Sequence, residues 1–134
     1  MKQVRRPVAI SIAIALMLCA TAAFAQMEEL RNSTPQQRAK LETAFMKMKL
    51  NLSRQQMERV LNINLKYAQQ MDPIIKGNEG KLRKVRDASA INRAKDRDLQ
   101  TVLSGDQYQA YLASKEEMRQ RMVEKFRQKQ GISG

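Results

Sequence analysis

A five-residue pattern that occurs twice, Leu-Ser-x-x-Gln, constrains the fold of this chain more than any other feature. The first copy runs from Leu52 to Gln56 and the second from Leu103 to Gln107, and apolar residues at helical spacing follow each copy. A serine with a glutamine three residues later is a capping box. The serine side chain accepts a hydrogen bond from the third helical N–H, and the glutamine side chain accepts one from the serine N–H. Each copy therefore predicts the start of a helix.

Another helix start lies upstream at Thr34, with proline at the first helical position and glutamine at the third. We predict a helix from Pro35 to Lys49. Its apolar residues recur at i, i+3, i+4 and i+7, which indicates one buried stripe along the helix. The stripe consists of Leu41, Ala44, Phe45 and Met48.

The two copies of Leu-Ser-x-x-Gln open the second and the fourth predicted helices. In the second helix, Pro73 either ends the helix or kinks it, because proline lacks an N–H and clashes with the preceding turn. The fourth helix extends to about Gln128. Aligning the two copies pairs apolar residues with apolar residues, as two helices in equivalent packing environments would show. The pairs are Met57 with Tyr108, Val60 with Tyr111, Leu61 with Leu112, and Met71 with Met122.

The third predicted helix, from Lys81 to Val102, has the weakest apolar pattern. Its apolar residues step by three and therefore drift around the helix instead of holding one side. Basic residues cover much of the rest, so this segment is either a solvated charged helix or a basic surface for a partner. No segment alternates with period two, and the predicted fold class is all-α with four helices.

The first 25 residues have the composition of a secretory signal peptide. A basic start with Lys2, Arg5 and Arg6 precedes an apolar run, and Ala23-Phe24-Ala25 fits a cleavage site. We therefore predict export to the periplasm. The predicted organisation is a cleaved signal peptide at residues 1–25, a mobile lead at 26–33, one helical domain at 34–128 and a disordered tail at 129–134.

Composition excludes several classes of function. The chain has no histidine, and its one cysteine, Cys19, lies in the predicted signal peptide. The usual ligands for zinc, copper(II) and nickel are therefore missing, and so is the commonest general base. The sequence also contains no phosphate-binding glycine loop and no nucleophile elbow. We expect no enzyme, no catalytic or metal site, and no cofactor.

The net charge indicates which partners to expect. The chain carries 25 Lys and Arg against 13 Asp and Glu, a net charge of +12. In an exported protein this excess favours acidic proteins, unfolded chains or anionic membrane surfaces as partners. Nucleic acid is not expected, because an exported chain meets little of it and the aromatic residues form no stacking platform.

Placed in this architecture, the repeated pattern resembles the signature of the Spy/CpxP family of small helical envelope proteins, a repeated Leu-Thr-x-x-Gln. Both copies here carry serine in the threonine place. The matching residues are Leu52, Ser53 and Gln56 in the first copy, and Leu103, Ser104 and Gln107 in the second. The resemblance implies a bent, cradle-like four-helix hairpin in an intertwined antiparallel homodimer, which holds unfolded clients on a concave basic surface without ATP. It also implies that the motif residues are structural caps and interhelix contacts.

We therefore predict an ATP-independent periplasmic holding chaperone that binds unfolded or misfolded envelope proteins and suppresses their aggregation. Positive charge would attract acidic clients, and flexible apolar side chains would retain them. The residues predicted to contact clients are Met46, Lys47, Met48, Met57, Arg83, Lys84, Arg86, Ile91 and Arg93. Two alternatives stay open: a regulatory subunit that docks on the sensor domain of an envelope stress-response kinase, and an electrostatic binder of anionic membrane surfaces.

Overall fold

The computed structural model describes residues 30–131, and these residues form four helices and no strand. The helices are α2 (Pro35–Leu50), α3 (Arg54–Lys76), α4 (Lys81–Gln100) and α5 (Gly105–Gly131). The all-α prediction is therefore confirmed, and the predicted ends of the first, third and fourth helices lie within three residues of the observed ones. The predicted signal peptide lies outside the described residues. Within residues 30–131, no helix is both long and apolar enough to cross a membrane.

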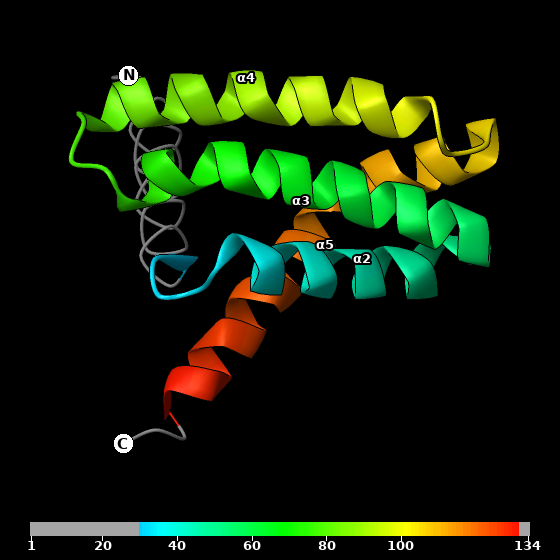
Figure 1. Ribbon diagram of the computed structural model, residues 1–134, viewed down its shortest axis with the longest axis horizontal. Coiled ribbons are helices and arrows are strands. Elements are labelled where there is room, and N and C mark those ends of the chain that lie inside the picture. The colour runs from blue at the N-terminus through cyan, green and yellow to red at the C-terminus, as the bar shows by residue number, and fades with distance from the viewer. Residues whose placement is uncertain (1–29, 132–134) are drawn as a thin grey trace, which may run out of the picture.

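Three helices lie alongside one another, and the fourth crosses them. Helix α3 packs against both α2 and α4, so it is the middle member of the three (Figure 1). Helix α5 starts near the end of α4 and runs obliquely across the group, packing mainly on α2. Its last turns pass beside the first half of α2, and its C-terminal end extends beyond the group (Figure 1).

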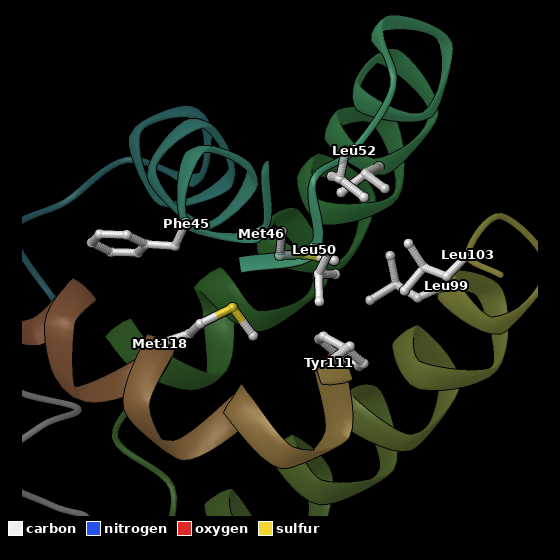
Figure 2. Close-up of a cluster of buried hydrophobic side chains, with 9 residues drawn as sticks. Phe45, Met46, Leu50, Leu52, Leu99, Leu103, Tyr111 and Met118 are labelled. Carbon is white, nitrogen blue, oxygen red and sulfur yellow. The ribbon is translucent and has the colours of Figure 1, made fainter. Parts of the chain in front are cut away.

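The hydrophobic core lies where the helix ends and starts meet. Figure 2 shows Leu50, Leu99 and Tyr111 pointing toward one another from α2, α4 and α5. The leucine of each Leu-Ser-x-x-Gln copy belongs to the same cluster. The full set of buried residues in this cluster is Phe45, Met46, Leu50, Leu52, Val60, Leu99, Leu103, Tyr111 and Met118. The core therefore joins all four helices at the level of the two repeated motifs.

The buried face of α2 differs from the predicted stripe. Ala44 is exposed and Met48 is 69% exposed. The buried residues are instead Arg38, Ala39, Thr43, Phe45, Met46 and Leu50. Thr43 is satisfied there, because its hydroxyl donates to Ala39 O at 2.7 Å and accepts from Asn64 Nδ2 at 3.0 Å. A polar residue with such partners can be buried at little cost, so apolar periodicity alone gives the wrong phase.

Pro73 does not end α3, since the helix continues to Lys76. The proline lies on the exposed side of the helix, and so does Gln69, whose carbonyl loses its usual N–H partner. Water can pair with that carbonyl. The helix ends three residues later at Lys76, and the next residue caps it, since Gly77 N donates to Pro73 O at 2.8 Å.

Residues 30–33, which belong to the predicted mobile lead, make contacts with α2. Ser33 is buried, and its N and Oγ both donate to Leu30 O, at 3.1 and 2.6 Å. Arg38 Nη1 donates to Ser33 O at 2.8 Å, and Arg38 Nη2 contacts Asp72 Oδ1 on α3 at 2.7 Å. Burial alone would raise the pKa of Asp72, but hydrogen bonds from Arg38 and Lys76 outweigh burial and lower it. The paired charges therefore fasten the start of α2 to the end of α3.

The C-terminal boundary also differs from the prediction. Helix α5 continues through residues 129–131, which were expected to belong to a disordered tail. Residues 26–29 and 132–134 lie outside the described residues.

The two helices that follow the repeated motif bury equivalent positions. Val60 and Tyr111, which the alignment pairs, are 0% and 1% exposed. The same offset of 51 residues also relates Tyr67 to Met118 and Ile75 to Phe126, and all four of these residues are buried. Among the aligned apolar pairs Leu112 differs, because it is 40% exposed whereas its counterpart Leu61 is half-buried. The repeat in the sequence thus corresponds to a repeat in packing.

Candidate functional site

Both copies of Leu-Ser-x-x-Gln form capping boxes. Gln56 N donates to Ser53 Oγ at 3.1 Å, and Ser53 N donates to Gln56 Oε1 at 3.0 Å. Ser104 and Gln107 repeat this arrangement at 3.2 and 3.0 Å. Each box satisfies two of the backbone N–H groups that a helix start leaves without a partner.

The two capping glutamines also bond to each other, which the sequence did not predict. Gln56 Nε2 donates to Gln107 Oε1 at 2.7 Å, and Gln107 Nε2 donates to Gln56 Oε1 at 3.2 Å. Gln107 Nε2 also donates to Leu50 O at 3.1 Å, and Gln56 Nε2 to Val102 O at 3.2 Å. This pair, named here the glutamine clasp, ties the starts of α3 and α5 to the ends of α2 and α4. Its role is structural, because it holds together the junction around which the core is built.

The C-terminal part of α4, Lys95–Leu99, is fixed by charged contacts to all three other helices. We name it the anchored end. The contacts are Lys95 with Glu42 of α2 at 2.6 Å, Asp96 with Tyr111 and Lys115 of α5 at 2.7 and 2.6 Å, and Asp98 with Tyr67 and Lys66 of α3 at 2.7 and 2.9 Å. Leu99 beside them is fully buried. Both apolar and charged contacts therefore fix the anchored end against the other helices.

These contacts shift the titration of the groups that make them. Burial and the hydrogen bond to Asp96 raise the pKa of the Tyr111 hydroxyl. The hydrogen bond to Asp98, together with burial, raises the pKa of Tyr67. Hydrogen bonds from Tyr67 and Lys66 lower the pKa of Asp98. At neutral pH both tyrosines therefore donate as neutral hydroxyls, and Asp98 accepts as a carboxylate.

The N-terminal part of α4, Leu82–Arg93, has no such anchors, and we name it the α4 arm. Leu82 is 89% exposed and Val85 is 51% exposed. Asp87 is its one carboxylate, and it lies 3.7 Å from Arg83 Nε and 3.0 Å from Arg86 Nε. In the described part of the chain, side chains of the α4 arm form hydrogen bonds and ion pairs only with one another. The arm thus presents positive charge and apolar surface together.

The structure separates the residues predicted to contact clients into four groups. Met46 is fully buried in the core, which corrects its assignment to a client surface. Met57 is half-buried and packs on the core cluster. Lys47 and Met48 are exposed on α2, on a different helix from the α4 arm. The remaining five lie together on the α4 arm: Arg83, Lys84, Arg86, Ile91 and Arg93.

Sequence reasoning missed the exposed apolar residues of the arm, because Leu82 and Val85 were counted toward a weak core pattern. Their spacing of three residues was the signal that could have found them. Residues that step by three drift around a helix, so some of them must leave the buried side. Leu99 is the one buried residue of α4, and it does not belong to the series of apolar residues that step by three.

Residues 30–131 contain no cluster of three or more acidic, histidine or cysteine side chains that could hold a metal ion. The two carboxylates at the anchored end, Asp96 and Asp98, are paired with lysines and tyrosines in neighbouring helices. What the described residues offer is the exposed surface of the α4 arm, which can bind a partner through charge and apolar contact.

Comparison with known proteins places the chain in a family. The model of the family described as a domain of unknown function (DUF4890) matches residues 23–111, more than half of the chain. The matched range includes both copies of Leu-Ser-x-x-Gln and all of α2, α3 and α4, and it ends inside α5 at Tyr111. No curated protein and no solved structure matches the chain. The protein therefore belongs to the DUF4890 family.

Proposed function

We propose that this protein is an ATP-independent holding chaperone of the periplasm, which binds unfolded or misfolded proteins on the α4 arm. The observation that supports this most directly is the composition of the arm's exposed surface. Leu82 and Val85 are exposed beside a group of cations. Lys84 has no ion-pair partner in the described residues, and Arg83 and Arg86 share one carboxylate. An apolar surface with surplus positive charge suits unfolded chains that expose apolar and acidic residues.

The proposed mechanism has two steps. The positive charge of the arm first attracts acidic segments of a client over a distance set by ionic screening, about 10 Å at 0.1 M salt. Apolar side chains of the client then cover Leu82 and Val85, and burial of one such side chain is worth about 1.5–3 kcal/mol. With so few apolar contacts, the client is held reversibly and can leave to fold.

We further propose that the protein is related to the Spy/CpxP family and acts as a cradle-like homodimer, with the α4 arms lining the cradle. The support for this is the position of the repeated motif, which caps α3 and α5 and joins them through the glutamine clasp. Sedimentation equilibrium measures the mass directly. We expect twice the mass of the chain at micromolar concentration, and a monomer at all concentrations would overturn the dimer.

An aggregation assay tests the proposed function. A chemically denatured acidic client is diluted into buffer of low ionic strength with and without near-stoichiometric protein, and light scattering is recorded. We expect suppression of scattering that weakens as salt is added, because the first step is electrostatic. The absence of suppression at low salt would contradict the proposal.

Two variants locate the activity on the arm. Replacing Arg83, Lys84 and Arg86 together by Gln should abolish most of the suppression, because it removes the arm's surplus charge. A matched control replaces three exposed arginines of α5 by Gln, which lowers the net charge equally elsewhere: Arg119, Arg121 and Arg127.

Leu82→Ser with Val85→Ser should also weaken holding, compared with Leu112→Ser as an exposed control on α5. Equal loss in arm and control variants would show that only net charge or general apolarity matters.

Crosslinking in cells separates the chaperone from a regulator. Many crosslinked partners are expected from a holding chaperone, whereas one dominant partner, a sensor kinase, would support the alternative predicted from the sequence. The arm is the surface to crosslink in either case, with a photoreactive residue at position 82.

A further inference from the structure

A groove between α2 and the last turns of α5 lies apart from the α4 arm. Its volume is about 540 Å³, within the range of pockets that hold small molecules. Gln37, Lys40, Leu41 and Ala44 of α2 form one wall. The α5 wall starts at Lys125, beyond the end of the family match at Tyr111. The groove therefore depends on the last turns of α5, which lie beside the first half of α2.

The groove combines an apolar floor with a basic rim. Leu41 is half-buried and Phe126 is buried, and together with Ala44 they provide the floor. Lys40 stands on the α2 side and Lys125 on the α5 side, both exposed. Neither lysine has a hydrogen-bond or ion-pair partner in the described part of the chain, and no acidic residue lines the groove. A third lysine, Lys129, extends the basic rim along α5.

We propose that this groove binds a single-chain amphiphile with an anionic head group. The apolar floor covers the chain, and the lysines on the two walls meet the head group, with their aliphatic stems extending the apolar surface. An extended peptide fits less well, because its backbone N–H and C=O groups need partners that the floor lacks. Gln37 and Gln128 are the two uncharged polar side chains of the lining that could supply them. An acyl chain has no such requirement.

Calorimetric titration of the purified protein with laurate, below its micelle concentration, tests the proposal. A second titration uses lauroyl-lysophosphatidylglycerol. Comparing it with laurate shows whether the groove prefers the carboxylate of a fatty acid or the phosphate of a phospholipid. Lauroyl-lysophosphatidylcholine, whose head has no net charge, is the control. We expect one anionic amphiphile bound per chain and binding of the neutral control weaker by at least about tenfold. Equal binding of all three, or none, would overturn the proposal.

Two variants place the ligand in the groove. Lys40→Gln with Lys125→Gln should weaken laurate binding at least about tenfold. The matched pair Lys47→Gln with Arg54→Gln, exposed cations outside the lining, should change it by less than about twofold. Ala44→Trp should block the groove without changing charge, whereas Ala113→Trp on the exposed side of α5 should not. Unchanged affinity in the lysine pair or in Ala44→Trp would contradict the assignment.

Circular dichroism and sedimentation accompany these titrations. Helicity equal to that of the parent chain shows that a variant has folded. A change of mass in Ala44→Trp alone would show that the groove is a contact between copies of the chain, which would overturn the ligand site. Substitutions in the α4 arm should leave laurate binding unchanged, so the outcome is independent of the chaperone proposal.

Discussion

The two ends of α4 belong to one helix, yet both their charge balance and their surroundings differ, since basic and acidic residues are equal in number in the anchored end and basic residues predominate in the α4 arm. In the anchored end, Asp96 and Asp98 pair with side chains of α5 and α3. In the α4 arm, the one carboxylate, Asp87, pairs with arginines of its own helix. Leu99 is fully buried, whereas Leu82 is 89% exposed. Charged side chains of α4 have a structural role in the anchored end, where their partners lie on other helices. In the α4 arm, where their partners lie on the same helix, the charges are available to a ligand.

Truncating a leucine at each end should give the largest contrast in stability. Leu99→Ala leaves a cavity in the core and should lower the free energy of unfolding by about 2–5 kcal/mol. Leu82→Ala should change it by less than about 0.5 kcal/mol, because the side chain is already in water. Urea denaturation followed by circular dichroism measures both. Similar values for the two variants would show that the arm is packed in solution.

Removing a carboxylate from each end should give a smaller contrast. Asp96→Ala leaves the buried Tyr111 hydroxyl without its acceptor, and a loss of about 1–3 kcal/mol is expected. Asp87→Ala breaks exposed pairs within one helix and should cost less than about 1 kcal/mol. The same denaturation experiment compares them. A larger loss for Asp87→Ala would mean that the arm makes structural contacts through this residue.

The glutamine clasp fixes the turn that follows the anchored end, so it should matter more than an ordinary cap. Ser104→Ala removes one capping bond and should cost about 1 kcal/mol. Gln107→Ala removes the cap partner and the clasp together, so we expect a larger loss, about 1–2 kcal/mol. Gln109→Ala, at an exposed position two residues later, is the control. If Gln107→Ala cost no more than Ser104→Ala, the bond between the glutamines would contribute nothing.

The smallest expected effect depends on pH. Folding raises the pKa of Tyr111 and Tyr67, so the stability they contribute is present below the tyrosine pKa of about 10 and is lost as pH rises above it. Helicity at moderate urea concentration should therefore fall as pH increases past about 10. The fall should be shallower in Tyr67→Phe and Tyr111→Phe. An identical pH profile in these variants would assign the alkaline loss to other groups.

The helix starts could be predicted because capping is local. Thr34, Ser53 and Ser104 each find their partners three residues away, so the spacing in the sequence was sufficient. The weak apolar pattern of α4 likewise predicted a helix with little buried surface. The candidate binding residues on the arm followed from the basic excess of that segment.

The phase of α2, the burial of Met46 and the anchored end could not be predicted, because each depends on a partner far away in the chain. Thr43 is buried because Asn64 bonds to it, and Arg38 because Asp72 does. A single sequence shows that these residues are polar, but not that another helix brings a donor or an acceptor to them.

The sequence by itself therefore determined that this protein is helical, where its helices begin, and that two of them occupy equivalent environments. The tertiary structure decided which charges are used in packing and which remain at the surface. The reason is physical: a capping bond needs residues one turn apart, whereas the value of a charge depends on what the folded chain places beside it.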